Sequence, residues 1–315
     1  MKEMKEWELH RGFLLDSAKG FDVIDCEQCG FKHIIPIPTS NVLESVYRQE
    51  YYSTEKPLYL ARYREDLEWW NLVYGDRYDV FEKHLPGHRR RILDIGSGPG
   101  YFLLHGKERG WDTLGIEPSK QAAAHSKALG LEIIEDFLDE ACTDQLGKFD
   151  VVHMSEVLEH IPDPIRMLEM AGKLLNDDGF LCVVVPNDYN PFQDALRKEC
   201  GYEPWWLAPP HHVNYFDFDS LSLLLRKTGF EEFLKEATFP IDMFLLMGYN
   251  YVGDDEAGRF CHNKRKTFEI NLTRAGQKTA KRELYKAFAE QGIGREVVFY
   301  ARKGAKKIDK KPMRG

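Results

Sequence analysis

The sequence predicts an α/β fold, in which helices cover both faces of a mostly parallel sheet. Three observations predict it: short apolar runs alternate with helical segments, a glycine-rich turn follows the first run, and an acidic residue follows the second. Short continuous apolar runs are typical of strands that are buried on both faces of a parallel sheet. The chain has 315 residues, enough for one such domain and smaller additions.

The glycine-rich turn follows a predicted strand over residues 91–95. Its informative residues are Asp94, Gly96, Ser97, Gly98, Pro99 and Gly100. Pro99 can open a helix predicted over residues 101–109, whose N-terminus presents unpaired N–H groups. Glycines let a ligand approach the backbone closely, so we expect a nucleotide-like ligand where the first strand ends. A glycine-rich turn without a ligand is the alternative, because this fingerprint alone is weak.

The next segments continue the alternation of strand and helix. We predict strands over residues 111–116, 131–134, 149–154 and 179–185, and helices over residues 120–129 and 163–175, the first of them started by Pro118. Glu117 lies about 20 residues after the first glycine, where its carboxylate can accept hydrogen bonds from ribose hydroxyls. After the third strand, Asp136 and Phe137 supply a carboxylate and a ring that could hold an adenine.

Taken together, these segments resemble class I S-adenosylmethionine-dependent methyltransferases. The stretches LDIGSGPG, GIEPS and FDVVHMSEVLEHIPDP are similar to the first, second and fourth motifs of that family. The resemblance implies a Rossmann-like, seven-stranded, mostly parallel sheet with an antiparallel last strand, S-adenosyl-L-methionine as cofactor, and cofactor contacts from Ser155 and Glu156. A dinucleotide dehydrogenase fits less well, since its fingerprint leaves two residues before the last glycine and this chain leaves one.

Composition indicates a soluble enzyme. Hydrophobic residues make up 43% of the chain, and the formal net charge is −8, which disfavours tight nucleic-acid binding. The tail over residues 303–315 is basic and is expected to be flexible. No apolar stretch approaches the length of a membrane span, and the first residues do not resemble a signal peptide. We therefore expect a cytoplasmic protein with neither a nucleic-acid nor a membrane partner.

The first 45 residues predict a small ribbon-like module. Cys26 and Cys29 have the spacing that brings two thiolates to one metal ion. His33 lies close by and His10 lies upstream, so these four residues form a candidate ligand set for structural zinc. The alternatives are a ribbon that has kept its shape and lost its metal, and a turn that holds two free thiols. In its second half the module resembles the zinc-binding module of sugar C-methyltransferases.

Residues 46–88 form an aromatic linker between this module and the methyltransferase domain predicted over residues 89–302. Aromatic residues at helical spacing indicate one or two helices packed on the domain. In related enzymes a lid over the cofactor comes from such a segment, and an aromatic face suits a cationic sulfonium. Tyr52 and Tyr59 are the predicted lid residues.

Methyl transfer to a hydroxyl or a carbon acid needs a base near the ends of the strands. Glu156, Glu159 and His160 follow the fourth strand and offer one candidate group. Capping or positioning of the following helix is the alternative role for at least one of Glu159 and His160.

A second group, His211 and His212, follows a stretch from Asn187 that is expected to be irregular. The sugar C-methyltransferases that this stretch resembles carry a Glu-His pair here, so the resemblance extends to His212 as the base and leaves His211 in doubt. A histidine hydrogen-bonded into a structural corner is the alternative.

Substrate selection is expected outside the shared core, including an insertion over residues 241–292. Its apolar residues 243–247 and a charged helical stretch over residues 278–291 could hold a small molecule or form a homodimer surface. The sequence thus predicts a methyltransferase that acts on a small-molecule acceptor, such as a sugar or another secondary metabolite. The alternative is a non-catalytic protein that binds S-adenosylmethionine as a sensor or scaffold.

Overall fold

The computed structural model describes residues 3–39, 43, 59–87 and 90–304. Tyr52 lies outside the described residues, as do the side chain of Tyr59 and most of the predicted tail. The prediction of a lid from Tyr52 or Tyr59 therefore concerns residues about which the structure says nothing.

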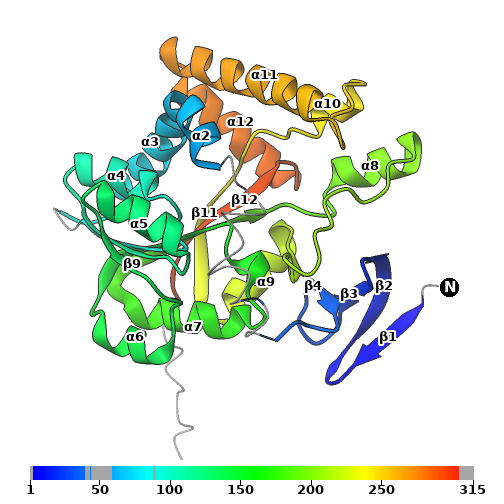
Figure 1. The fold of residues 1–315 in the computed structure, drawn as a ribbon, viewed down its shortest axis with the longest axis horizontal. Helices are drawn as coiled ribbons and strands as arrows, with labels where there is room; N and C mark the ends of the chain where they lie inside the picture. Colours follow the sequence, from blue (N-terminus) through cyan, green and yellow to red (C-terminus); the bar gives the residue numbers. More distant parts are fainter. Residues whose placement is uncertain (1–2, 40–42, 44–58, 88–89, 305–315) are drawn as a thin grey trace, which may run out of the picture.

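The central sheet has seven strands in the order β11-β12-β9-β8-β5-β6-β7. The strands are β5 (Arg91–Ile95), β6 (Asp112–Ile116), β7 (Glu132–Ile134), β8 (Phe149–Ser155), β9 (Leu175–Pro186), β11 (Phe230–Ala237) and β12 (Glu296–Lys303). Strands β5 to β9 pair in parallel, whereas β12 runs antiparallel to both β9 and β11. This arrangement confirms the predicted fold class (Figure 1).

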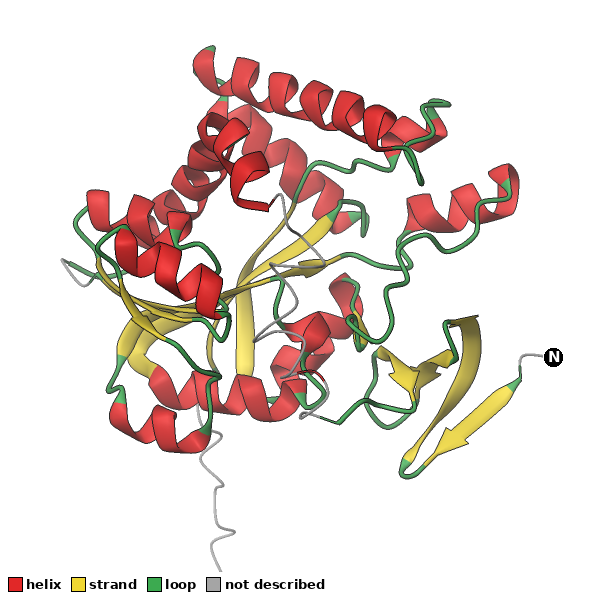
Figure 2. Cartoon of the chain, viewed as in Figure 1, coloured by secondary structure: helices red, strands yellow, loops and turns green. Residues whose placement is uncertain are grey.

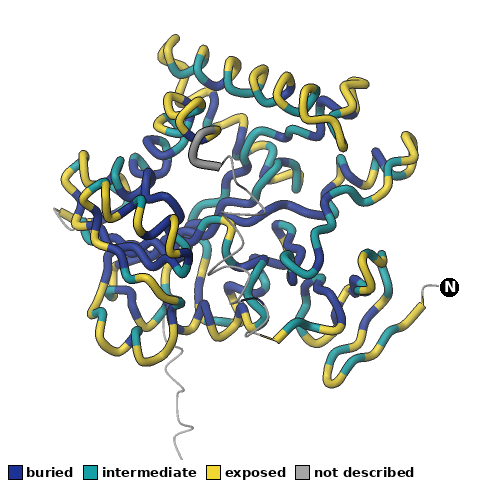
Figure 3. The backbone as a smooth tube through the Cα atoms, in the orientation of Figure 1, coloured by how far each residue is buried: buried dark blue, intermediate teal, exposed yellow. Residues whose placement is uncertain are grey.

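Helices cover both faces of this sheet, as Figure 2 shows. The helices before the insertion are α2 (Tyr59–Glu65), α3 (Leu67–His84), α4 (Tyr101–Glu108), α5 (Lys120–Ala128), α6 (Glu140–Gln145), α7 (Pro164–Leu174), α8 (Pro191–Cys200) and α9 (Phe218–Lys227). Helices α4, α5, α7 and α9 pack on the strands, whereas α8 lies away from the sheet (Figure 1). Neighbouring residues of a strand point to opposite faces, so Ile92 packs with Tyr78 and Phe102, while Leu93 belongs to the core with Leu168 and Leu221. Most residues of the strands are buried (Figure 3), but β11 is mostly half-buried and Asp177 and Asp178 of β9 are exposed.

Two helices begin differently from the expectation that a proline opens them. Helix α4 follows Gly100, which has a left-handed backbone with φ of 82°, and Pro99 lies before that residue. Helix α5 is capped by Ser119, whose side chain accepts a hydrogen bond from the N–H of Ala122. Pro99 and Pro118 therefore lie in the turns that precede the helices. The residues directly before the helices are Gly100 and Ser119, and the Ser119 side chain satisfies one of the free N–H groups at the helix start.

Of the two alternative roles considered for Glu159 and His160, capping of the following helix is wrong, while positioning of that helix stays a prediction. Both residues lie in the 3₁₀ turn η2 (Leu158–His160), and helix α7 is capped by Asp163, whose side chain accepts from the N–H of Arg166. Both side chains are therefore available for other contacts.

The stretch after Asn187 is not irregular throughout, because it contains helix α8. The Asn190 side chain accepts from the N–H groups of Phe192 and Gln193, and the Gln193 side chain accepts from the N–H of Asn190. This reciprocal cap, with Pro191 in the first turn, starts a helix that the sequence pattern did not reveal.

A second sheet lies beside the central one and has the order β1-β2-β3-β4-β10. Its strands are β1 (Met4–Trp7), β2 (His10–Ala18), β3 (Phe21–Cys26), β4 (Lys32–Ile35) and β10 (Asn214–Tyr215). The N-terminal strands form a ribbon-like sheet, as predicted, but the last strand comes from a segment far along the chain. The sheet thus extends beyond the predicted module of residues 1–45.

The insertion is helical and consists of α10 (Met243–Leu246), α11 (Asp255–Arg274) and α12 (Lys278–Glu290). Helix α11 leaves one side exposed (Figure 3) and packs against α3 and α12. Within the described part of the chain, no helix has the length and apolar character that a membrane span requires.

Candidate functional site

A pocket of about 390 Å³ opens at the carboxyl ends of the parallel strands β5 to β8. Its volume falls in the range of small-molecule sites, roughly 300 to 1,000 Å³. The predicted site residues that line it are Asp94, Gly96, Ser97, Gly98, Glu117, Pro118, Asp136, Phe137, Ser155, Glu156 and His160. The sequence motifs of four strands therefore meet in one place.

The glycine turn has a left-handed backbone at three positions, with φ of 73° at Gly96, 53° at Gly98 and 82° at Gly100. A Cβ at Gly100 would lie 2.6 Å from the Ser126 side chain, so this glycine lets α4 pack and is not among the residues that line the pocket. Ser97 Oγ is buried in the pocket wall and has no hydrogen-bond partner among the described residues. A polar ligand atom would satisfy it.

Glu117 stands at the end of β6 with only 5% of its surface exposed. Its two carboxylate oxygens accept the N–H groups of Gly98 at 2.7 Å and Ser119 at 2.8 Å. Burial raises the pKa of Glu117 to about 7, and the two backbone hydrogen bonds oppose that rise. Each oxygen has a further lone pair, so this carboxylate can accept hydrogen bonds from a ligand in the pocket.

Asp94 is held by two buried side chains that the sequence analysis missed, His153 and Arg77. The His153 Nδ1–H group donates to Asp94 Oδ1 at 2.7 Å, and Arg77 Nη1 donates to His153 Nε2 at 3.4 Å. Burial lowers the pKa of His153 and favours the neutral ring, and the Arg77 donor at Nε2 places the remaining ring proton on Nδ1. A histidine inside the otherwise apolar run VVHMS was the available signal.

Two further strand ends contribute predicted residues. Asp136 Oδ1 accepts the N–H of Phe137 at 2.8 Å, and both residues line the pocket. Glu156, next to Ser155, has a left-handed backbone with φ of 57°, a conformation that costs a non-glycine residue free energy. Its N–H donates to Val184 O at 2.9 Å, which ties the turn to β9.

An aromatic wall closes one side of the pocket. The Tyr63 ring stacks between Trp70, at a centroid distance of 5.1 Å, and Tyr101, at 4.5 Å, with interplanar angles of 3° and 6°. These rings and Tyr74 line the pocket. The aromatic linker thus contributes to the site through residues of α2 and α3 that the sequence analysis did not select.

The predicted bases His160 and His212 lie side by side, with ring centroids 4.9 Å apart. His160 lines the pocket, and its Nδ1–H group donates to the backbone oxygen of His211 at 2.8 Å. His211 and His212 are not among the residues that line the pocket.

Glu159 completes this group from a buried position, with 1% of its surface exposed. Its Oε1 lies 3.7 Å from His160 Nε2, and ligand atoms of Glu159, His160 and His212 lie within 4.8 Å of one another. Burial, followed by the charge of Glu156, raises the pKa of Glu159 well above its ordinary value and favours the protonated carboxyl.

The four predicted metal ligands also converge. Ligand atoms of His10, Cys26, Cys29 and His33 all lie within 4.8 Å of one another. His10 Nδ1 is 3.4 Å from Cys29 Sγ and 3.7 Å from Cys26 Sγ. Zinc bonds of ordinary length in a tetrahedron would separate sulfur and nitrogen ligands by roughly 3.6 Å. The donor set and its spacing therefore fit zinc.

His33 presents the appropriate ring atom to this cluster. Its Nδ1–H group donates to Ile34 O at 3.0 Å, which leaves a lone pair on Nε2. The ring is 1% exposed, and Nε2 has no hydrogen-bond partner among the residues described. Metal-ligating histidines commonly bind a backbone carbonyl through the other nitrogen in this way.

Comparison with known proteins gives a consistent family. A family described as a methyltransferase domain matches residues 60–233. The ubiquinone biosynthesis O-methyltransferase of Actinobacillus pleuropneumoniae serotype 7 is 34% identical over 102 residues, which cover 29% of this chain and 44% of that protein. The enzyme of the same name from Psychrobacter cryohalolentis is 32% identical over 127 residues, which cover 38% of this chain and 48% of that one. The chain thus spans less than half the length of these relatives.

Among solved structures, the plantazolicin methyltransferase in complex with a monoazolic desmethylPZN analog and SAH has a TM-score of 0.50. It is 14% identical in sequence, and the match covers 84% of this chain and 97% of that one. This likeness shows a shared fold.

Proposed function

This chain belongs to the family of methyltransferase domains, and we propose that it transfers the methyl group of S-adenosyl-L-methionine to a small-molecule acceptor. The observation that carries the proposal is the position of Glu117. Its buried carboxylate stands at the second strand end and is bound to Gly98 of the glycine turn, where the hydroxyls of a ribose could donate to it. The named activity of the matched relatives supports the same reaction.

The lining residues suit the other parts of this cofactor. Asp136 and Phe137 offer a carboxylate and a ring for an adenine, and Ser97 Oγ offers a buried polar atom that needs a partner. The electron-rich faces of Tyr63 and Tyr101 suit a cationic sulfonium. When bound, S-adenosylmethionine supplies an electrophilic methyl group, so the main task of the protein is to orient the acceptor.

We propose His160 as the residue that takes a proton from the acceptor. It lines the pocket, and the hydrogen bond to His211 O fixes its Nδ1–H, so that Nε2 is the basic atom of the ring. His212 packs against His160 and has a supporting role, while His211 contributes its backbone oxygen. The proposed base is therefore His160, which lies beside His212, the base expected from the sequence.

A non-catalytic sensor of S-adenosylmethionine is the competing function. Titration calorimetry with S-adenosylmethionine and S-adenosylhomocysteine measures binding, and a methyl donor with an isotopic label, incubated with metabolite extracts, measures transfer. The enzyme is expected to bind both compounds and to label at least one metabolite. Binding without a labelled product in any extract would favour the sensor.

We infer that the protein acts in the cytoplasm and has no nucleic-acid partner, since a net charge of −8 disfavours nucleic-acid binding. The insertion is the proposed homodimer surface, because its Met247, Tyr249 and Phe260 are 57%, 50% and 44% exposed.

We also propose that His10, Cys26, Cys29 and His33 hold a structural zinc ion. The sulfur-to-nitrogen distances at His10 and the buried, unpartnered Nε2 of His33 support it. Four protein ligands would fill the coordination sphere, which is typical of structural and not of catalytic zinc. Metal analysis of the purified protein, expected to find one zinc ion per chain, tests this.

A further inference from the structure

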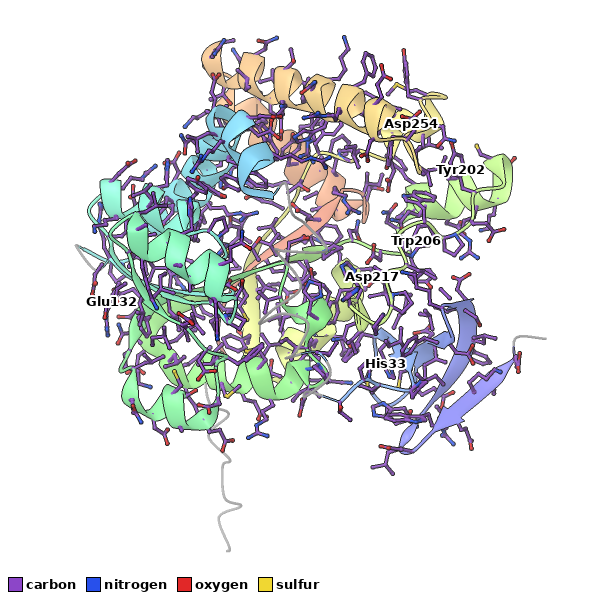
Figure 4. The ribbon with its side chains drawn as sticks, in the orientation of Figure 1. His33, Glu132, Tyr202, Trp206, Asp217 and Asp254 are labelled. Carbon is purple, nitrogen blue, oxygen red and sulfur yellow. The ribbon has the colours of Figure 1, made fainter. Side chains whose placement is uncertain are left out.

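We propose that the Cys/His cluster, which comprises His10, Cys26, Cys29 and His33, positions the acceptor side of the pocket, which is the turn that carries the proposed base His160. Asn214 is the residue that connects the cluster to this turn. The inference rests on the proposed function and assigns a task to a part of the chain outside the methyltransferase fold. Figure 4 shows His33 in the N-terminal sheet, near the segment that carries Asp217.

The first link runs from the cluster to β10. His33 lies on β4, opposite Asn214 in the register of the β4–β10 pair. The N–H of Ile34 donates to Val213 O at 2.9 Å. The cluster takes its ligands from β2, from the end of β3, from the following turn and from β4, so a metal ion would hold these segments in one arrangement.

The second link runs from β10 to the turn η2. Asn214 is 1% exposed, and its Nδ2 donates to Leu158 O at 2.9 Å and to Ile161 O at 2.8 Å. The two N–H groups of the Asn214 side chain thus bind the two ends of the turn that carries Glu159 and His160. The N–H of Val213 also donates to Glu159 O at 2.7 Å. The position of His160 therefore depends on the segment that pairs with β4.

Other contacts hold the N-terminal sheet to the domain without the metal. Lys32 Nζ lies 2.5 Å from Asp217 Oδ2, the Phe31 and Phe216 rings are 5.2 Å apart, and Lys227 Nζ donates to Cys29 O at 2.7 Å. Loss of the metal is therefore expected to loosen β4, β10 and η2 without unfolding the domain. The glycine turn and Glu117 lie on β5 and β6, outside this path.

The test compares Cys29→Ser with Cys200→Ser, which changes an exposed free cysteine outside the cluster. Zinc content, affinity for S-adenosylhomocysteine and amide hydrogen exchange are measured on the full-length protein. We expect Cys29→Ser to lose zinc and to exchange about tenfold faster over residues 158–161 and 213–215. Exchange over residues 94–100 and the affinity are expected to stay within about twofold of the wild type. Cys200→Ser is expected to match the wild type in every measurement.

A second variant, Asn214→Asp, keeps the size of the side chain and removes both donors. It is expected to retain zinc and the affinity for S-adenosylhomocysteine, yet to show faster exchange over residues 158–161. With labelled donor and a responsive metabolite extract, kcat should fall about tenfold while the KM for S-adenosylmethionine is unchanged, and this split separates positioning from general destabilisation.

Two results would overturn the inference. One is unchanged exchange over residues 158–161 in zinc-free Cys29→Ser or in Asn214→Asp, and the other is wild-type protein that contains no metal. Failure of the wild type to bind S-adenosylhomocysteine would instead refute the proposed function, because metal content and exchange do not depend on turnover.

Discussion

The Glu117 carboxylate accepts the backbone N–H of Gly98 at 2.7 Å, although 19 residues separate them in the chain. The contact joins the end of β6 to the glycine turn after β5, so that one buried carboxyl group connects the two strand ends. A ligand that donates hydrogen bonds to Glu117 would therefore also affect the position of the glycine turn.

Cofactor affinity is expected to fall in acid because of Glu117. Its pKa in the folded protein is about 7, and hydroxyl donors bind the ionised form better than the neutral one. Affinity for S-adenosylmethionine, measured by calorimetry from pH 8 to pH 6, should weaken by about tenfold. Glu117→Gln should bind weakly with a flat profile, while Glu132→Gln, at an exposed position, should retain the wild-type profile. A flat profile for the wild type would contradict this assignment.

The same pKa shift predicts how the stability of the unliganded protein depends on pH. Because burial raises the pKa of Glu117 in the folded state, the unfolded chain releases this proton at a lower pH. The contribution of the neutral carboxyl is therefore present below about pH 4.5 and is lost as the pH rises through about 7. The free energy of unfolding of the wild type, relative to that of Glu117→Gln, should therefore decrease as the pH rises from about 4.5 through about 7.

Gly98→Val should abolish cofactor binding. The residue has φ of 53°, which a β-branched side chain adopts only with strain, and it lines the pocket. Affinity for S-adenosylmethionine should fall by roughly a hundredfold or more. Gly110→Val is the matched control, because φ is 85° there and a Cβ would meet nothing within 4 Å. It should cost stability without a loss of binding; equal losses of binding would show that strain alone is responsible.

Alanine substitution of His160, His212 and His211 should lower turnover to different extents, with the largest effect at His160, which lines the pocket. His160→Ala should lower turnover by about a hundredfold, as removal of a general base does, while cofactor affinity is retained. His212→Ala should have a smaller effect and His211→Ala the smallest, because His211 supports His160 through its backbone oxygen. Label transfer into a responsive extract measures this order. Turnover that is lost in His212→Ala and kept in His160→Ala would return the base to His212.

His153→Leu should destabilise the fold. The variant leaves buried Asp94 and Arg77 each without a hydrogen-bond partner that they have in the native protein. Such losses cost about 2–4 kcal/mol in the free energy of unfolding, which urea denaturation measures. A stability equal to that of the wild type would mean that water replaces the ring.

Removal of metal should lower the thermal midpoint. A ligand that binds only the folded state stabilises it, so dialysis against a chelator should reduce the midpoint of the wild type by several degrees. Cys26→Ser should start from the lower value and respond no further to the chelator. A chelator that leaves the wild-type midpoint unchanged would argue against a structural metal ion.

The sequence predicted the central sheet well, because each of its parallel strands is a local apolar run followed by a polar residue. Glu117 and Asp136 could be selected for the same reason, since their roles depend on where a strand ends. The four candidate metal ligands His10, Cys26, Cys29 and His33 were also selected, because three of them lie within eight residues of one another.

Contacts between distant segments could not be predicted in this way. No local pattern indicates that Asn214 pairs with His33, and two residues are too few to show strand periodicity. Arg77 meets His153 only after α3 packs on the sheet. Glu159 could be selected from its place after the fourth strand, but its burial could not be predicted. Helix α8 was missed because its start depends on a reciprocal cap that the three letters NPF do not reveal.

The shared edge between β4 and β10 limits how this protein could be recombined with its relatives. A chimera that exchanged only the residues before the first parallel strand would bring in a foreign β4 but keep the native Asn214 and Tyr215 opposite it. The junction would be mismatched in both register and side chains. Successful grafts should therefore transfer residues 208–217 together with the N-terminal sheet, because these two segments form one sheet although they are far apart in the chain.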